Sequence, residues 1–127
     1  MVLGDFNARI HRRFNLEDDI LGPYIFGSSQ ARFDPASNRS LLMELCTSNG
    51  LVVGNTLFDE APDHQVTCYN VGSWPSDPVA PKAFGQIDFV LITKGWSHLL
   101  NRVSSHRELA LVSPHFLVVA SSELQVP

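Results

Sequence analysis

The amino-acid sequence predicts a domain of mixed α/β class, described as α+β in some classification schemes. Segments with strand-like apolar runs outnumber helical segments, and the clearest helix lies between predicted strands along the chain. The length of 127 residues suits one domain, and 44% of the residues are hydrophobic, which is enough for a core. No internal repeat, low-complexity tract or linker divides the sequence.

Five short segments rich in apolar and β-branched residues are typical of strands. They cover residues 1–5, 51–53, 65–69, 86–92 and 115–120. A polar, acidic segment at residues 11–22 follows the first of them, and three prolines predict a surface loop at residues 70–82.

The clearest helix is predicted at residues 37–49. Ser37 or Asn38 can cap its N-terminus through a side-chain oxygen, and Gly50 suits the left-handed conformation that commonly ends a helix. The stripe predicted to be buried consists of Leu41, Leu42, Leu45 and Cys46.

Charge and composition restrict the classes of function. The formal net charge of −4 argues against tight, sequence-independent nucleic-acid binding by the chain alone, because such binding relies on Lys and Arg. A basic group formed by Arg9, His11, Arg12 and Arg13 could contact nucleic-acid phosphates, but a solvated loop is the preferred interpretation. Cys46 and Cys68 lack the spacing of a redox or zinc motif. Because no apolar run reaches ~20 residues and no signal peptide is recognisable, we expect an intracellular protein that has no membrane partner.

Four polar residues lie within or at the ends of apolar segments: Asp5, Asn7, Asp88 and His115. Residues i and i+2 of an extended segment share a face, so Asp5 and Asn7 are expected to meet one ligand. Asp88 lies inside an apolar segment, where an unpaired charge is costly to bury. His115 is its natural partner, because a carboxylate bound to one ring nitrogen holds the other toward a substrate.

Each of these residues alone also has an ordinary structural explanation. Asp5 and Asn7 suit an Asx turn, and Asp88 suits an edge strand. His115 suits a histidine at the rim of a core. Their order, and the strands on which they lie, make the group more specific than any single member, so these four are the candidate catalytic residues.

Four segments together resemble a known family. They are GDFN at residues 4–7, LVVGNTLF at residues 51–58, QIDFVL at residues 86–91 and SPH at residues 113–115. In this order, the chain resembles the endonuclease/exonuclease/phosphatase superfamily, which includes deoxyribonuclease I and the apurinic endonucleases. The likeness covers essentially the whole chain and is greatest to the endonuclease domains of LINE-type retrotransposons. It implies that residues 1–127 are the C-terminal portion of one such domain, half of a four-layer α/β/β/α sandwich.

The resemblance also implies a role for each candidate residue in phosphodiester hydrolysis. Asp5 would orient or activate the attacking water, and Asn7 would hydrogen-bond the scissile phosphate. Asp88 would pair with His115, which would contact the phosphate and stabilise its charge or accept a proton. Mg²⁺ (or Mn²⁺) would polarise the phosphate, and nucleic acid would be the substrate.

The sequence departs from the family pattern in ways that weaken these expectations. The acid that precedes the family's histidine is Pro114 here, which supplies no carboxylate to a cation. The family's Thr-Trp pair reads Thr67-Cys68. The metal-binding glutamate belongs to the family's N-terminal half, and residues 17–19 are expected to face solvent instead. The metal ligands are therefore unknown, and we expect impaired or absent metal binding and catalysis by this chain alone. We also expect an exposed sheet edge that pairs with the missing half or with another copy.

Two other functions stay open. A degenerate, non-catalytic remnant that serves as an interaction module fits the presence of Pro114 and the missing half. A phosphatase acting on small phosphate esters or phosphoinositides would use the same core residues. The sequence does not distinguish DNA, RNA and such esters as substrates.

Overall fold

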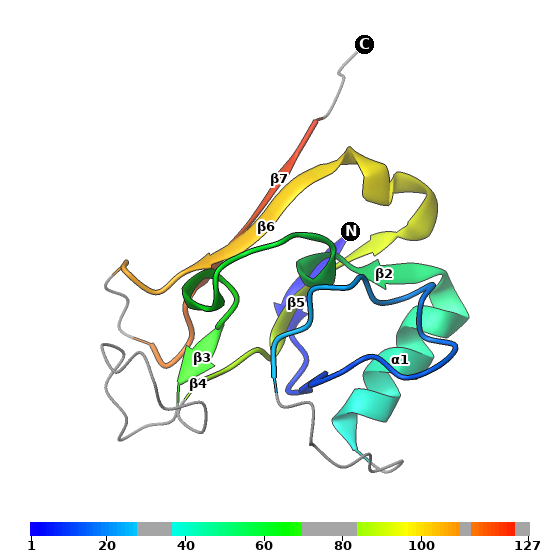
Figure 1. The fold of residues 1–127 in the computed structure, drawn as a ribbon, viewed down its shortest axis with the longest axis horizontal. Coiled ribbons are helices and arrows are strands. Elements are labelled where there is room, and N and C mark those ends of the chain that lie inside the picture. The colour runs from blue at the N-terminus through cyan, green and yellow to red at the C-terminus, as the bar shows by residue number, and fades with distance from the viewer. Residues whose placement is uncertain (28–36, 70–83, 110–112, 124–127) are drawn as a thin grey trace.

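The computed structural model describes residues 1–27, 37–69, 84–109 and 113–123 (Figure 1). In this part of the chain the main elements are β1 (Val2–Asp5), α1 (Asn38–Asn49), β2 (Leu51–Val53), β3 (Cys68–Tyr69), β4 (Phe84–Gly85), β5 (Asp88–Thr93), β6 (Leu100–His106) and β7 (Leu117–Ser122). Three 3₁₀ helices accompany them: η1 (Gly54–Leu57), η2 (Pro62–His64) and η3 (Lys94–Leu99). The predicted mixed class of helix and strand is confirmed.

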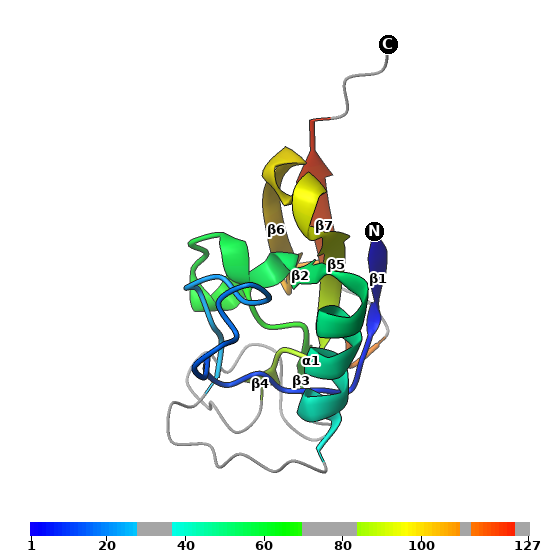
Figure 2. The same cartoon turned by 90° about the vertical axis from the view of Figure 1, so that its right-hand side faces the viewer.

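The described strands form small antiparallel sheets. One has the order β1-β5-β2, and the others are the pairs β3-β4 and β6-β7. Strand β5 is the centre of the first sheet, where it pairs with β1 on one side and with β2 on the other. Figures 1 and 2 show α1 packed beside this sheet and the long β6-β7 pair extending away from it.

Strand β5 is buried on both faces because its side chains alternate between two core clusters. Phe89 and Leu91 point into the cluster that contains the helix. Val90 and Ile92 point into a cluster that contains residues of β6 and β7. A strand covered on both sides needs apolar residues at successive positions, which explains the continuous run that identified this segment in the sequence.

The helix has the predicted boundaries. The Ser37 side chain accepts a hydrogen bond from the backbone N–H of Ser40. At the other end Gly50 has φ 61°, and its N–H donates to the carbonyl of Cys46. A residue with a Cβ is disfavoured in this left-handed conformation, so the glycine determines where the helix stops.

The predicted buried stripe of the helix is only half correct. Leu42 and Cys46 are buried, but Leu41 and Leu45 are 62% and 42% exposed. The buried face instead adds Met43 and the Arg39 side chain to Leu42 and Cys46, and this set has the i, i+3, i+4, i+7 spacing of one helix face. A buried arginine carries no apolar signal, so the sequence pattern misplaced the face.

Two strand predictions also needed correction. The strand expected at residues 65–69 is limited to β3, because η2 turns the preceding chain and the N–H groups of Gln65 and Val66 donate to the Pro62 carbonyl. Strand β6 was not predicted at all. Its buried positions include Ser104 and Ser105, so it lacks the apolar run by which a buried strand is recognised.

The polar segment after β1 contributes to the core more than its composition suggests. Ile20 and Leu21 are buried in the helix cluster, and Leu21 forms a parallel bridge with Val53 of β2. The loop predicted at residues 70–82 lies outside the described residues. Among the helices that the structure describes, none is long and apolar enough to cross a membrane.

Candidate active site

The β1-β5 register places two carboxylates side by side. Asp5 ends β1, Asp88 begins β5, and the two are direct cross-strand partners. The pairing continues for one further contact, since the Phe6 N–H donates to the Ile87 carbonyl at 3.0 Å. Two acidic side chains brought together at a strand end are costly unless a cation or a hydrogen-bond donor lies between them.

His115 is carried to this strand end by β3. It forms an antiparallel bridge with Cys68, and hydrogen bonds lie on both sides of the bridge. The Tyr69 N–H donates to the Pro114 carbonyl at 3.0 Å, and the Phe116 N–H donates to the Thr67 carbonyl at 2.8 Å. The histidine is therefore held by backbone contacts that do not depend on its own ring.

The ring of His115 lies between the two carboxylates. Its Nδ1 is 3.0 Å and 3.1 Å from the two Asp88 oxygens. Since a carboxylate only accepts hydrogen bonds, Nδ1 carries the proton and Nε2 is the ring nitrogen left for a ligand. Nε2 is 3.7 Å from Asp5 Oδ2, which is too long for a direct hydrogen bond but allows one small molecule to contact both atoms. The Asp88 side chain is 17% exposed, against 37% for His115 and 47% for Asp5.

Two buried side chains position the start of β5. Thr67 Oγ1 accepts hydrogen bonds from the N–H groups of Ile87 and Asp88 at 2.9 Å and 3.1 Å. Asn55 donates to the Asp88 carbonyl at 3.2 Å and accepts from the Val90 N–H at 2.8 Å. These positioning roles were not predicted, although Asn55 lies in a segment that carried the family resemblance and Thr67 is the retained member of the family's Thr-Trp pair.

Asn7 lies outside the strand. Its φ is 47°, and its N–H donates to Asp5 Oδ1 at 2.8 Å, as in an Asx turn. The expectation that Asp5 and Asn7 share one face of an extended segment is therefore wrong, because the extended conformation ends at Asp5. The Asn7 carbonyl accepts from the Asn38 side chain at 2.9 Å, so the start of the helix fixes this turn.

Gly4 is not required by a turn. It lies within β1, opposite Phe89, and a Cβ at this position would meet no atom within 4 Å. Gly4 instead lines a groove of about 350 Å³ between the β1-β5 strands and residues 113–118. Asp88 and His115 also line this groove, so the paired residues open onto a concave surface.

Arg9 adds a positive charge near the site. A Cβ at Gly85 would collide with the Arg9 guanidinium, so the glycine provides the space in which this side chain lies. Burial raises the pKa of the Cys68 thiol, the nearby Arg9 lowers it, and the Asp88 and Asp5 carboxylates raise it. Arg9 and the two carboxylates therefore all lie within electrostatic range of Cys68, which places a guanidinium in the neighbourhood of the site. Arg9 is exposed, as the interpretation of a solvated loop requires, and its charge also suits the alternative of phosphate contact.

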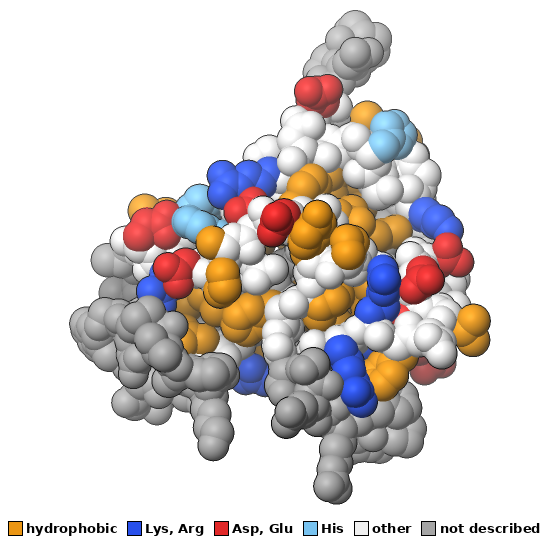
Figure 3. Space-filling model, in the orientation of Figure 1, with side chains coloured by type: hydrophobic (Ala, Val, Ile, Leu, Met, Phe, Trp, Pro, Cys, Tyr) orange, Lys and Arg blue, Asp and Glu red, His pale blue; other side chains and the backbone are white. Residues whose placement is uncertain are grey.

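The acidic segment at residues 17–19 is used in ion pairs. Glu17 binds Arg39, Asp18 lies 3.3 Å from an Arg13 nitrogen, and Asp19 lies 2.7 Å from Lys94 Nζ. Figure 3 shows basic and acidic side chains interspersed around an apolar area on one face, with no large basic patch among the described residues drawn there. The three acids are structural partners of nearby cations, and Glu17 is largely buried rather than facing solvent as expected.

The geometry allows a cation at the strand end. One donor atom each from Asp5, Asp88 and His115 lies within 4.8 Å of the other two. Oxygen ligands suit Mg²⁺, which commonly takes one or two carboxylates and keeps several waters. Asp88 directs both of its oxygens to His115, so Asp5 is the carboxylate best placed to serve as a ligand. Pro114 contributes only a carbonyl, which already accepts from Tyr69.

Comparison with protein-family models, curated proteins and solved structures gives no match to this chain. A function is therefore proposed from the fold and from the geometry of the site.

Proposed function

We propose that this chain is the C-terminal part of a metal-dependent phosphodiesterase domain of the endonuclease/exonuclease/phosphatase type that acts on nucleic acid. The observation that carries the proposal is the Asp88–His115 pair beside Asp5. These three side chains come from segments far apart in the sequence, and Asp88 and His115 line one groove. Hydrolysis of a phosphodiester needs separate groups for the attacking water and for the charge on phosphorus, and this arrangement supplies both.

The side chains at the site have distinct roles in the proposed reaction. Asp88 holds the His115 ring with the proton on Nδ1, so Nε2, on the Asp5 side, serves as a base or, once protonated, as a donor to a phosphate oxygen. Asp5 is the more exposed carboxylate and orients the water that attacks phosphorus. Arg9, whose guanidinium lies against Gly85, supplies a positive charge that attracts the phosphate, and the Asn7 side chain, in the turn that binds Asp5, hydrogen-bonds it.

A divalent cation such as Mg²⁺ would polarise the phosphate and stabilise the leaving oxygen when bound beside Asp5. The described part of the chain offers few further oxygen ligands at this strand end, because Asp88 is committed to His115. We therefore propose that the remaining ligands come from an N-terminal half-domain, which would complete the α/β/β/α sandwich. The exposed edge strand β1 suits that pairing, because all four of its residues are exposed.

The test is the nicking of supercoiled plasmid DNA by this chain extended through the coding sequence upstream of Met1. We expect nicking in Mg²⁺ that is abolished by a chelator. Asp5→Asn and His115→Asn should each lower the rate roughly 100-fold or more. His98→Asn is the matched control, since His98 is exposed and lies outside the site. Nicking that survives both site substitutions would contradict the assignment.

A non-catalytic remnant is the second candidate function, and Pro114 is the observation that favours it. The proline takes the position of an expected acid and uses its carbonyl for a β3 contact. An upstream sequence that is unrelated or interrupted by a stop codon, together with no nicking by the chain, would support the remnant. Under the leading proposal, the upstream sequence encodes a strand-helix-strand pattern with a glutamate at a strand end.

A further inference from the structure

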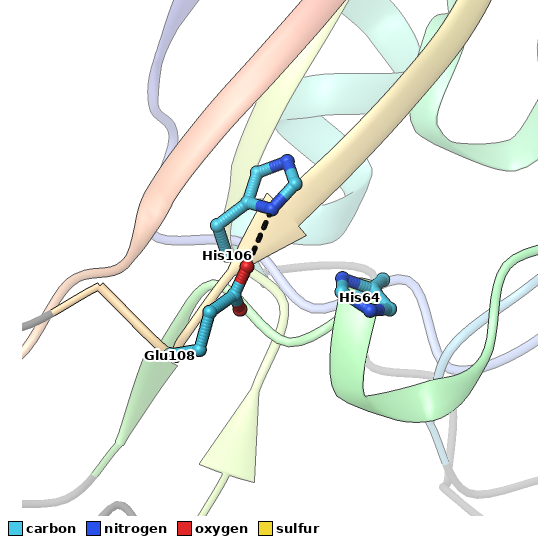
Figure 4. A group of neighbouring side chains, drawn as sticks. All are labelled: His64, His106 and Glu108. Atoms are coloured by element: carbon cyan, nitrogen blue, oxygen red, sulfur yellow. Dashed lines mark hydrogen bonds and ion pairs between the residues drawn. The ribbon is translucent and has the colours of Figure 1, made fainter.

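A second cluster of possible metal ligands lies away from the candidate active site. It contains His64 at the end of η2, His106 at the end of β6, and Glu108 in the turn that follows β6. One donor atom from each lies within 4.8 Å of the other two. Figure 4 shows the three side chains converging from two separate segments, with Glu108 directed at His106. The two imidazole rings are 5.5 Å apart in an edge-to-face arrangement.

The hydrogen bond of His64 defines which nitrogen can bind a cation. Its Nδ1 is 2.8 Å from the Ser105 carbonyl, and a carbonyl only accepts hydrogen bonds. Nδ1 therefore carries the proton, and the lone pair is on Nε2. Metal-binding histidines commonly donate the other ring N–H to a backbone carbonyl in this way, because the contact fixes the tautomer and the ring orientation.

His106 is held in a complementary way. Its Nδ1 is 2.8 Å from Glu108 Oε1, and its Nε2 is 3.2 Å from Ser104 Oγ. The hydroxyl of Ser104 can donate or accept, so it supports a proton on either ring nitrogen. Glu108 Oε1 only accepts, so in the free protein His106 Nδ1 carries a proton that it donates to this oxygen. A metal ion can replace that proton, after which Nε2–H donates to Ser104.

The surrounding charges favour a cation. Arg102 is paired with Glu60, and the Arg107 guanidinium lies 3.3 Å from Asp63. The hydrogen bond from Arg102 is the main cause that lowers the pKa of Glu60, which also lies within electrostatic range of His64 and His106. Three carboxylates, counting Glu108, face two guanidinium groups, which leaves one excess negative charge beside the neutral imidazoles.

We propose that His64, His106 and Glu108 bind a zinc ion that links η2 to the end of β6. Two imidazoles and one carboxylate form a donor set that zinc binds tetrahedrally, with water in the fourth position. Imidazole nitrogens select zinc over Mg²⁺, which prefers oxygen ligands, so this site is chemically distinct from the one at Asp5. Ligand atoms around tetrahedral zinc lie roughly 3.3 Å apart, given Zn–N distances of ~2.0–2.1 Å. The Glu108 side chain is 55% exposed and has room to close the remaining gap.

In the proposed site, unlike an ordinary surface cluster, hydrogen bonds fix the position of η2 and the orientation of both imidazole rings. The His64–Ser105 contact attaches η2 to a strand that is paired along its length with β7. Both histidines are partly buried, and each has a hydrogen-bond partner that orients its ring. These contacts reduce the conformational freedom that a cation must remove on binding.

The test is titration of the whole chain with Zn²⁺ by isothermal calorimetry, and with Co²⁺ by visible absorption. We expect stoichiometric binding and the absorption pattern of tetrahedral Co²⁺. His64→Gln, His106→Gln and Glu108→Gln should each weaken Zn²⁺ binding at least roughly tenfold. His98→Gln should leave it unchanged, and excess Mg²⁺ should not displace the ion.

Glu108→Gln is the decisive variant, because Glu108 is exposed and its hydrogen bonds are with His106 and with its own backbone. Circular dichroism of each variant excludes loss of fold as the cause of weaker binding. Wild-type affinity in a folded Glu108→Gln variant and in either folded histidine variant would overturn the proposal. Loss of Zn²⁺ binding only in His115→Asn would also overturn it, since the ion would then be at the other cluster.

Discussion

Replacement of Arg39 by methionine removes the contact that holds the loop after β1 against the helix. The Arg39 guanidinium makes two hydrogen bonds to the Glu17 carboxylate at 2.7 Å and 2.8 Å. It also donates to the carbonyls of Ile10 and Arg12 at 2.9 Å and 2.6 Å. Methionine keeps much of the apolar stem but none of these donors, so the substitution isolates the polar contribution.

The magnitude follows from burial. The side chains of Arg39 and Glu17 are only 7% and 15% exposed, so Glu17 would be left as a buried charge with no cation beside it. Removing one partner of a buried ion pair costs about 3–5 kcal/mol. A domain of this size has a free energy of unfolding of about 5–15 kcal/mol, so the variant is expected to lose a large part of its stability.

Urea unfolding monitored by circular dichroism measures this loss. Lys94→Met is the matched control, because Lys94 also binds a carboxylate, Asp19, but the two side chains are 59% and 83% exposed and screened by solvent. We expect a much lower urea midpoint for Arg39→Met than for Lys94→Met. Equal midpoints would refute the argument that Arg39 anchors the loop.

The same measurement at lower pH provides a second check. Burial raises the pKa of Glu17, but hydrogen bonds from Arg39 and the Phe14 N–H more than offset this and hold it below its usual 4.5. A carboxyl with a depressed pKa in the folded state stabilises the protein above its unfolded pKa, and this stabilisation is lost as the pH falls through the folded value. The difference between wild type and Arg39→Met should therefore narrow below about pH 4.5. A constant difference would contradict the assignment to Glu17.

Three further substitutions or reactions test separate parts of the structure. Thr67→Val should lower the free energy of unfolding by about 1–3 kcal/mol, because two backbone N–H groups lose their acceptor; an unchanged urea midpoint would contradict this. Gly4→Ala should change that free energy by no more than about 0.5 kcal/mol, because the added Cβ meets open space; a larger loss would show that the glycine is structurally required. Burial raises the pKa of Cys46 to about 11, so iodoacetamide should label it only in urea, as read by mass spectrometry; rapid labelling of the folded chain would contradict its burial.

Sequence patterns predicted those helices and strands that are determined by residues within the element or next to it. Ser37 and Gly50 determine the two ends of α1, and the apolar run of β5 reflects burial on both of its faces. Strand β6 was missed because it buries serines, and the buried face of α1 was misplaced because it includes Arg39. Both errors arise where a polar residue, which carries no apolar signal in the sequence, occupies a buried position.

In the candidate site, too, some contacts could be predicted from the sequence and others depend on the tertiary structure. The contact between Asp88 and His115 was expected because an acid inside an apolar segment needs a partner, and the structure contains that contact. The support of Asp88 by Thr67 depends on a sheet register that no local pattern specifies. Likewise, the left-handed conformation of Asn7 follows from its Asx turn and its contact with the helix, so alternation along a strand did not predict it.

The most direct test of the proposed phosphodiesterase site is a double-mutant cycle on plasmid nicking. The rates of Asp88→Asn, His115→Asn and the combined variant are compared in the extended protein, with chelator as the blank. If Asp88 acts by positioning His115, the two residues work as a unit, and the double variant should be no slower than His115→Asn alone. Independent effects that multiply, or single substitutions that leave the nicking rate unchanged, would contradict the proposed role of this pair.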